Sequence, residues 1–566
     1  MSVERRPWEI IESYRGKYFS GRWPTIPEMY RAIVSRYGDR ACFTVYEPDR
    51  ISLTYNEALV LIEAIARWLR NQGIRRGDTV ALTGKNSPEW AVAYLAVLFA
   101  GATVVPVDYQ LKNEEADLLI KTSRAKMIFV DEEKQEHYLD MFPGKAISLR
   151  KGAGTYLYDL DGPAAEIEEA ESQDLAAILF TSGTMGKPKG VMLTHENLVS
   201  DSYLAQQIPF KVEYTDVFYA LLPLHHAYTM LAVFIETISS GAEVVFGKKM
   251  VTPVILKELK QGKITMLLGV PMLFNKLLAG ILKGIRAKGP LVYGLISALM
   301  GISGFIKKVF GINPGKKIFH AVLEQASLTT LRVCICGGGP LAPSVFRKYN
   351  QLGIDFVQGY GLTETSPIIT LNPVEHYKET SVGKVVPQVD MKILNPDERG
   401  VGEVIVKGPM VMKGYFEMPG ETAASFTADG YLKTGDLGYL DDENYLYLTG
   451  RAKNIIVTEG GKNVYPEEIE NEFQLYDEIE QILVRGFVQD RKMKVERIEA
   501  LVYPNGEAFK DQASAALPGE AVKSRVEAII SEVNQRLLSY QKIERVTVLD
   551  EPMEMTTTKK IKRDTV

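Results

Sequence analysis

Cysteine is scarce in this chain, since only Cys42, Cys334 and Cys336 occur among 566 residues. Three thiols are too few for the disulfide framework of a secreted domain. Cys334 and Cys336 also lack the second pair of ligands that a structural zinc site needs. We therefore expect three reduced thiols in the core, and neither a disulfide scaffold nor a zinc site.

The sequence also lacks an excess of charge of one sign, with 66 Lys and Arg against 71 Asp and Glu. The resulting net charge of −5 gives no general reason to expect nucleic acid as a partner. Residues 1–16 contain no continuous apolar segment of the kind found in a secretory signal. This absence predicts a cytoplasmic location.

No uncharged stretch reaches the about 20 residues that a spanning helix needs, and the apolar stretch at residues 291–306 also falls short of that length. One interpretation is a buried helix that is broken near Gly301 and Gly304. The other is a surface, at about residues 289–310, that contacts an apolar substrate or the inner face of a membrane, with Lys307 and Lys308 meeting anionic lipid.

Apolar residues make up 46% of the chain, whose length exceeds that of a single core and predicts two or more domains. Helical periodicity alternates with short apolar runs, most clearly at residues 53–108, and indicates an α/β fold with largely parallel sheets wrapped by helices. After about residue 450, short strands and two amphipathic helices predict a small α+β domain. We expect domains at 1–450, with an insertion at about 280–330, and at 451–566.

The first glycine-rich loop, TSGTMGKPKG at residues 181–190, follows the apolar run AAILF. Pro188 stands where a Walker A loop needs its second glycine, so that motif is excluded. Glycine backbone, hydroxyl groups and lysines are nevertheless suited to an anion. The alternative is a solvated hairpin. The residues expected to bind phosphate are Thr181, Ser182, Gly183, Thr184, Gly186, Lys187 and Lys189.

Two further glycine-rich loops follow predicted strands. CGGGPLAP at 336–343 allows a flat ligand to approach the backbone, although a plain tight turn would look the same. QGYGLTETSP at 358–367 resembles a dinucleotide loop only until Glu364, which replaces its last glycine. A carboxylate would repel pyrophosphate unless a cation intervened. We therefore expect Glu364 to bind Mg²⁺, with the Thr363 hydroxyl as a neighbouring donor.

Seven motifs stand in one order: TSGTMGKPKG, LPLHHAY, GGGPL, QGYGLTE, YLKTGDLG, GRAKN and TTTKKIKR. This order resembles the adenylate-forming superfamily of acyl-CoA synthetases, luciferases and peptide-synthetase adenylation domains. The resemblance extends from about residue 25 to residue 563. It implies an enzyme that joins a carboxylic acid to ATP, releases pyrophosphate, and passes the acyl group from acyl-AMP to a thiol.

The resemblance also implies roles for individual residues. The 181–190 loop would wrap the β- and γ-phosphates, Thr363 would reach the α-phosphate, and Asp436 would accept both ribose hydroxyls. Tyr360 would stack against adenine and Arg451 would brace the ribose, although KTGD taken alone reads as a turn. The residues expected to bind adenosine are Gly338, Gly339, Pro340, Gly359, Tyr360, Gly361, Asp436 and Arg451.

His226 would line the acyl pocket near the carboxylate, and a histidine satisfied within the core is the alternative. Because neighbouring side chains diverge on a strand or a helix, we do not expect His225 and His226 to chelate one metal. In the superfamily the C-terminal domain pivots, here about Lys453. Lys560 would contact the carboxylate and α-phosphate in the first step, a solvated basic tail being the alternative. Gly460 and Gly461 would line the CoA tunnel in the second step.

The 358–367 loop, the tail and the insertion resemble the long-chain acyl-CoA synthetase branch, so the expected substrate is a long-chain fatty acid, with ATP, Mg²⁺ and CoA. Several alternatives remain open at this stage. They are a fatty acyl-AMP ligase, a loader of an acyl carrier protein, a CoA ligase of a medium-chain or aromatic acid, and a non-catalytic nucleotide-binding protein at the membrane. The sequence also leaves a homodimer open.

Overall fold

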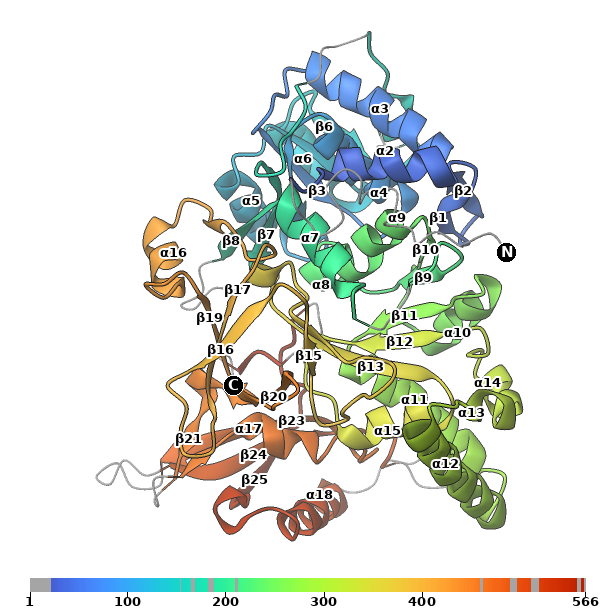
Figure 1. Cartoon of the computed structure of the whole chain (residues 1–566), viewed down its shortest axis with the longest axis vertical. Coiled ribbons are helices and arrows are strands. Elements are labelled where there is room, and N and C mark those ends of the chain that lie inside the picture. The colour runs from blue at the N-terminus through green and yellow to red at the C-terminus, as the bar shows by residue number, and fades with distance from the viewer. Residues whose placement is uncertain are drawn as a thin grey trace.

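The computed structural model describes residues 22–152, 154–163, 168–181, 188–208, 212–458, 462–488, 496–509, 519–556 and 561–563. Figure 1 shows a small sheet with its helices at the top, a larger sheet through the middle, and the C-terminal residues below it in orange and red. Helices wrap the parallel parts of both sheets. The expected α/β class is confirmed.

The smaller sheet has seven strands in the order β18-β8-β7-β4-β3-β5-β6. Its middle strands run parallel and are fully buried, while β8 pairs antiparallel with β7. Burial on both faces explains their continuous apolar runs. The strands are β3 (Thr79–Thr83), β4 (Thr103–Val107), β5 (Met127–Val130), β6 (Ala146–Ser148), β7 (Leu175–Thr181), β8 (Lys189–Thr194) and β18 (Gly414–Tyr415).

The larger sheet has thirteen strands, ordered β16-β17-β19-β20-β15-β14-β13-β12-β11-β9-β10-β1-β2. Its parallel part holds β1 (Ala41–Val45), β9 (Val217–Ala220), β10 (Glu243–Phe246), β11 (Met266–Gly269), β12 (Val333–Cys336) and β13 (Asp355–Tyr360). Strand β2 (Ile51–Thr54) pairs antiparallel at one edge. The antiparallel part holds β14 (Thr370–Leu371), β15 (Gly383–Val385), β16 (Asp390–Leu394), β17 (Gly402–Lys407), β19 (Leu432–Leu440) and β20 (Tyr445–Arg451).

Helix α4 (Pro88–Phe99) lies between the two sheets, because it contacts β3 and β4 of one and β1 and β2 of the other. Nearly all of its residues are buried, as expected for a helix that is apolar on every side. Helix α3 (Tyr55–Asn71) begins where Thr54 and Glu57 form a capping box. The other helices of this part are α2 (Ile26–Tyr37), α5 (Asn113–Thr122), α6 (Glu132–Met141), α7 (His195–Ala205), α8 (Ala227–Thr229), α9 (Glu236–Ser240) and α10 (Thr252–Gln261).

The insertion between β11 and β12 consists of α11 (Pro271–Arg286), α12 (Pro290–Phe310), α13 (Gly315–Ile318) and α14 (His320–Gln325). The expectation of a buried helix broken near Gly301 and Gly304 is wrong. Helix α12 is continuous for 21 residues and is mostly exposed. At Gly304 it packs closely on Gln351, whose side chain would lie 2.7 Å from an added Cβ atom. Among the described residues, it is the one helix long and apolar enough to cross a membrane.

The residues after β20 form smaller sheets. Strands β23 (Ile479–Val488) and β24 (Glu496–Pro504) pair antiparallel, and β25 (Arg545–Val548) joins β24 in parallel. Apolar side chains of this sheet pack with helices α17 (Pro466–Asn471) and α18 (Gly519–Asn534), beside the short pair β21 (Ile456–Val457) and β22 (Asn463–Val464). The expected α+β character is confirmed, whereas the domain boundary at 450/451 and the mobility stay predictions.

Candidate functional site

Several residues assigned to the site from the sequence lie outside the described part of the chain. They are Ser182, Gly183, Thr184, Gly186, Lys187, Gly460, Gly461 and Lys560. The remaining assigned residues are described. Most of them lie around the carboxyl ends of the parallel strands of the larger sheet and on its antiparallel part.

Two of the glycine-rich loops start at one edge of the sheet. The parallel register aligns Gly269 of β11 with Cys336 of β12, and Cys336 with Gln358 of β13. The loops at 337–342 and 359–364 therefore leave the sheet side by side. This is the edge at which open α/β sheets bind ligands.

The first two residues of the 337–340 loop are positions that favour glycine. A Cβ atom added at Gly337 would lie 3.0 Å from the ring of Tyr228, and Gly338 has a φ of +77°. The Tyr228 hydroxyl donates a hydrogen bond of 3.0 Å to the carbonyl oxygen of Ile335 in β12. The loop that follows β9 is thus held against the Gly338–Pro340 loop.

The loop after β13 requires glycine at position 361. A Cβ atom there would lie 1.4 Å from the carbonyl oxygen of Pro367. The Thr365 hydroxyl accepts a hydrogen bond of 2.9 Å from the amide of Leu362, which closes a 3₁₀ turn at Thr363–Thr365. Thr363 and Glu364 are consequently presented on a tight, fixed turn beside β8.

Glu364 is connected to the end of the phosphate loop through Tyr415. The Tyr415 hydroxyl donates to Oε1 of Glu364 at 2.9 Å, and the ammonium of Lys189 lies 4.9 Å from the centre of the Tyr415 ring. Lys189 also forms an ion pair with Glu421. Thr181 and Lys189 are paired across β7 and β8, so the two described ends of the phosphate loop lie next to each other.

Sequence reasoning missed the contact of Tyr415 with Glu364, and no local sequence pattern predicts it. Strand β18 pairs with β8, so Tyr415 lies opposite Val191 although more than 200 residues separate them. The amide of Phe416 also donates to the carbonyl oxygen of Gly190 at 2.7 Å. Long-range strand pairing, rather than a motif, brings this phenol to Glu364.

Asp436 occupies the centre of a second polar cluster. The Tyr360 hydroxyl donates to its Oδ2 at 2.6 Å, and Nε of Arg451 lies 2.8 Å from its Oδ1. Asp436 and Arg451 are register partners on β19 and β20. Burial, and then the charge of Asp436, raise the pKa of Tyr360 well above its usual range. The phenol therefore stays protonated and donates to the carboxylate.

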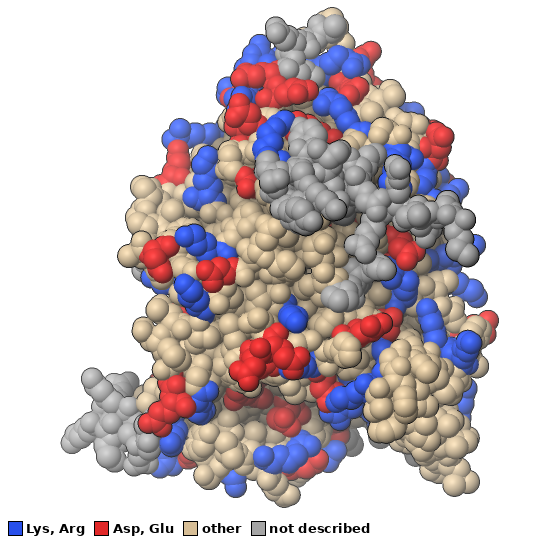
Figure 2. Space-filling view, in the orientation of Figure 1, with Lys and Arg blue, Asp and Glu red and all other residues tan. Residues whose placement is uncertain are grey.

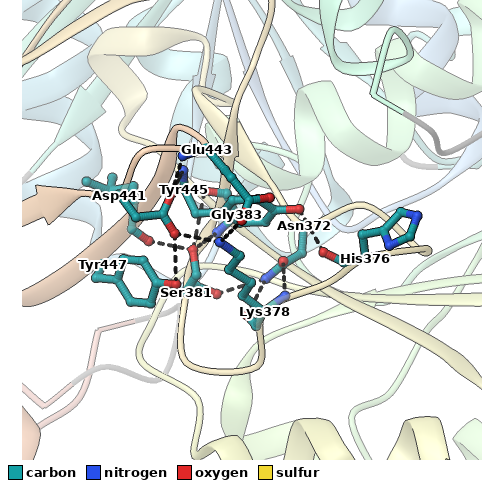
Figure 3. A network of polar contacts seen from close by, with 10 residues as sticks. Asn372, His376, Lys378, Ser381, Gly383, Asp441, Glu443, Tyr445 and Tyr447 are labelled. Atoms are coloured by element: carbon teal, nitrogen blue, oxygen red, sulfur yellow. Dashed lines mark hydrogen bonds and ion pairs between the residues drawn. The ribbon is translucent and has the colours of Figure 1, made fainter. Parts of the chain in front are cut away.

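The hairpin that carries Asp436 and Arg451 is tied at its other end to the 372–383 segment (Figure 3). Lys378 lies 2.7 Å from Asp441 and 2.8 Å from Glu443, while Asn372 accepts the Lys378 amide and donates to the Ser381 carbonyl oxygen. Charge-assisted contacts of this density make the turn between β19 and β20 rigid. We infer that this network positions the strands and takes no part in chemistry.

The two adjacent histidines do not diverge as expected. Their ring centroids are 4.2 Å apart, because His226 has an extended backbone at the start of α8 and lies on neither a regular strand nor a helix. Asp108 lies 3.5 Å from Nε2 of His225. Asn86 fixes this loop by donating to the carbonyl oxygen of Leu222 and accepting from the amide of Leu224, at 2.8 and 3.0 Å. His226 lies half-buried on this loop.

The C-terminal part contacts the Gly338–Pro340 loop through Gln474. Its Oε1 accepts the Ala342 amide at 2.8 Å and its Nε2 donates to the Pro340 carbonyl oxygen at 3.0 Å. Lys453, the expected pivot, lies exposed in the 3₁₀ turn Ala452–Asn454 directly after β20. Hydrogen bonds of Gln474 therefore connect the C-terminal part of the chain to the Gly338–Pro340 loop.

The chemistry of the donors fits one Mg²⁺ ion bound together with a nucleotide. Among the described residues, no group of three or more His, Cys, Asp or Glu side chains could hold a metal. Mg²⁺ commonly uses only one or two carboxylates together with substrate phosphates and water. The half-buried Glu364 beside β8 can supply that single carboxylate. The three cysteines are buried free thiols, as expected.

Known proteins resemble this chain over most of its length. The chain matches the AMP-binding enzyme family over residues 30–416. It is 29% identical to a feruloyl-CoA synthase of Amycolatopsis sp over 83% of this chain and 86% of that protein. It is 28% identical to a long-chain-fatty-acid–CoA ligase of Bacillus subtilis over 82% of each.

A solved structure supports the fold. O-succinylbenzoate coenzyme A synthetase (MenE) from Bacillus subtilis, in complex with ATP and magnesium ion, superimposes with a TM-score of 0.73 at 24% identity, covering 95% of this chain and 98% of that one. The fold is thus shared with this solved enzyme. Because the family match extends over more than half of its residues, the chain belongs to the AMP-binding enzyme family and is an adenylate-forming acid–CoA ligase.

Proposed function

We propose that the enzyme activates a long-chain fatty acid with ATP and transfers the acyl group to CoA. The observation that carries this choice of acid is the insertion between β11 and β12. Its first helix, α11, begins at Pro271, next to the Gly338–Pro340 loop. A Cβ atom added at Gly339 would lie 3.5 Å from the Pro271 side chain. From there α11 extends an apolar face away from the site; its buried residues are Leu273, Phe274, Leu277, Leu278, Ile281, Leu282 and Ile285.

In the first step, a carboxylate oxygen of the fatty acid attacks the α-phosphorus of ATP. The bond from that phosphorus to the bridging oxygen breaks, and pyrophosphate leaves with the electron pair. Two anions have to meet, so positioning and charge neutralisation are the tasks of the protein. We assign the 181–190 loop to the leaving phosphates, Thr363 to the α-phosphate and Lys560 to the carboxylate and α-phosphate.

We assign the adenosine to the Gly338–Pro340 loop, the Tyr360 ring and Asp436. The Asp436 carboxylate already accepts from Tyr360 and pairs with Arg451. Each carboxylate oxygen has a second acceptor position, so it is able to accept a ribose hydroxyl without losing these partners. Glu364 would hold Mg²⁺, which neutralises phosphate charge when bound.

In the second step, the sulfur of CoA attacks the acyl carbonyl of acyl-AMP. The bond between the acyl carbon and the phosphate oxygen breaks, AMP leaves and the thiol proton is lost. We propose that the C-terminal domain pivots about Lys453 between the two steps and that Gly460 and Gly461 then line the path of the CoA arm. The contact between Gln474 and Pro340 belongs to one of the two orientations.

A second acid class is favoured by one specific observation, the similarity to a feruloyl-CoA synthase over 83% of the chain. An aromatic acid is shorter and more rigid than a long-chain fatty acid, so a panel of acids of different length distinguishes the two substrate classes. An acyl carrier protein remains the alternative acceptor. We propose a cytoplasmic enzyme, with a homodimer open to measurement.

The test is pyrophosphate exchange into ATP with a panel of acids from acetate through ferulate to stearate, followed by assay of acyl-CoA. Exchange with palmitate and stearate and formation of their CoA thioesters is the expected result. Exchange with ferulate alone would contradict the long-chain fatty acid as substrate and favour an aromatic acid. Exchange without formation of acyl-CoA would contradict CoA as the acceptor. Lys560→Ala should abolish exchange while supplied acyl-AMP is still converted, and equal loss of both would contradict the two-step assignment.

A further inference from the structure

Helix α12 of the insertion presents an apolar stripe to solvent. Leu295, Ile302 and Phe305 are 63%, 54% and 62% exposed, and Leu291 and Val309 extend the same stripe by one turn at each end. The spacing of three and four residues places these side chains on one helix face. Figure 2 shows this face as a projecting uncharged surface at the lower right, with Lys and Arg beside it.

The inner face of α12 is mixed, because Met300 is buried and Tyr293, Ile296 and Leu299 pack against the core, while two polar residues of the helix are buried there as well. The buried ammonium of Lys307 lies 2.6 Å from both Oδ1 of Asn350 and Oδ1 of Asp355, and Ser303 is buried as well. A surface helix of a soluble domain keeps its apolar residues on the inward face, whereas α12 has large apolar residues on its outer face too. An apolar face of this extent on the outside marks a contact site.

The same inner contacts tie α12 to the site. Asp355, which pairs with Lys307, is the first residue of β13, and β13 leads to Tyr360 and the loop that holds Glu364. Asn313, just beyond the helix, also donates to Asp355 at 3.1 Å. The outer face of α12 is therefore fixed in orientation relative to the nucleotide loops.

The charged side chains on α11, α12 and α13 are of one sign. Residues 259–323 contain ten Lys and Arg and no Asp or Glu, whereas the whole chain has a net charge of −5. Exposed basic side chains flank α12 at both ends; they are Lys283, Arg286, Lys288, Lys308 and Lys317. A concentration of basic residues in an acidic protein indicates an anionic partner.

Three occupants of this face were compared. A membrane-spanning position would expose Lys307 and Ser303 to lipid and break their contacts with the core. A second copy of α12 packed antiparallel on the first would bring Lys288 of one copy close to Lys308 of the other, with no acidic residue on α11, α12 or α13 to compensate. An anionic bilayer surface takes up the apolar stripe and pairs with the flanking cations at once.

We propose that α12 docks in the plane of an anionic membrane surface, with Leu291, Leu295, Ile302, Phe305 and Val309 in the interface and the flanking lysines and Arg286 at the headgroups. The inference concerns the surface and does not depend on which acid the enzyme activates. It gives the insertion a second role besides that of its buried helix α11.

The test is co-sedimentation of the full chain with vesicles of phosphatidylcholine alone or with about 30 mol % phosphatidylglycerol. Binding to the anionic vesicles is expected to be at least about tenfold tighter, and to weaken in about 0.5 M NaCl. Lys288→Gln/Lys308→Gln/Lys317→Gln should weaken it about 100-fold, at about fivefold per charge. Leu295→Ser/Ile302→Ser/Phe305→Ser should weaken it at least about tenfold.

The matched control is Val60→Ser/Leu118→Ser, which removes two exposed apolar side chains far from α12 and should leave binding unchanged. Unchanged thermal unfolding midpoints establish that each variant is folded. Equal vesicle binding by the wild type and both α12 variants would overturn the proposal. A different result would also overturn it: no vesicle binding by the wild type, together with a dimer in sedimentation equilibrium that Leu295→Ser/Ile302→Ser/Phe305→Ser abolishes.

Discussion

The hydroxyl of Tyr360 lies 2.6 Å from Oδ2 of Asp436, and this contact joins two elements of the site. Tyr360 ends β13, while Asp436 lies on β19 opposite Arg451. The carboxylate is thus oriented from both sides before any nucleotide binds. Preorganised groups of this kind lower the cost of ordering a site at the moment of binding.

Removal of the Tyr360 hydroxyl should weaken ATP binding and leave the chemical step almost intact. Tyr360→Phe keeps the ring for stacking but frees one side of Asp436, and a hydrogen bond to a charged group contributes about 1.5–3 kcal/mol. Because Tyr360 is only half-buried, we expect an effect at the lower end of this range, which corresponds to a rise of about tenfold in KM for ATP. Tyr431→Phe, which loses a bond to Asp390 on the far strand, is the control. An unchanged KM would show that Asp436 needs no support from Tyr360.

Glu364 should determine the Mg²⁺ requirement. Glu364→Gln retains the hydrogen bond from Tyr415 but removes the charge, so we expect at least about a 100-fold loss of kcat and a higher Mg²⁺ concentration for half-maximal exchange. Mg²⁺ titration of pyrophosphate exchange measures both. Glu421→Gln, which removes the carboxylate paired with Lys189, should leave the Mg²⁺ dependence as it is. If Glu364→Gln had the Mg²⁺ dependence of the wild type, Glu364 would not be the metal ligand.

Position 361 should accept no residue larger than glycine. The Cβ of Gly361→Ala would lie 1.4 Å from the carbonyl oxygen of Pro367, so the backbone of the loop has to move. We expect the free energy of unfolding to fall by about 3 kcal/mol or more, with loss of ATP binding. Gly420→Ala, where nothing lies within 4 Å of the added atom, should be close to neutral. Urea unfolding of both variants decides this, and equal midpoints would contradict the clash.

The strands and their loops were predictable because buried parallel strands have continuous apolar runs and end in glycine. The contacts of Tyr415, Asn86 and Gln474 were not, because each depends on pairing between segments far apart in the chain. The exposure of α12 was misjudged for a related reason: an apolar run shows that water is avoided but does not say whether protein or lipid replaces it. The histidine pair was misjudged because its backbone is irregular.

Stability should depend on pH through the buried Glu236. Burial raises the pKa of Glu236 to about 8 from 4.5, although the Ser202 hydroxyl donates to it at 2.6 Å. The folded protein retains this proton where the unfolded chain loses it, so the stabilisation is complete below pH 4.5 and is lost as the pH rises to about 8. As the pH rises over this range, the free energy of unfolding of Glu236→Gln should fall by up to about 5 kcal/mol less than that of the wild type.

Urea unfolding between pH 5 and 8 measures the difference between the two proteins. The exposed Glu520→Gln serves as the control, and its pH profile should follow that of the wild type. Parallel profiles for Glu236→Gln and the wild type would show that the carboxyl is ionised in the folded protein.

Gln474 should influence the balance between the two half-reactions. In the proposed pivot about Lys453, the hydrogen bonds of Gln474 to Pro340 and Ala342 have to break. Gln474→Ala removes about 1 kcal/mol from this orientation, so the half-reaction that uses it should slow by about fivefold while the other accelerates. Gln541→Ala, which loses a bond to Glu468 within the C-terminal part, should change neither rate. Rates of pyrophosphate exchange and of acyl transfer from supplied acyl-AMP test this, because equal changes in both rates are incompatible with hydrogen bonds that stabilise one orientation.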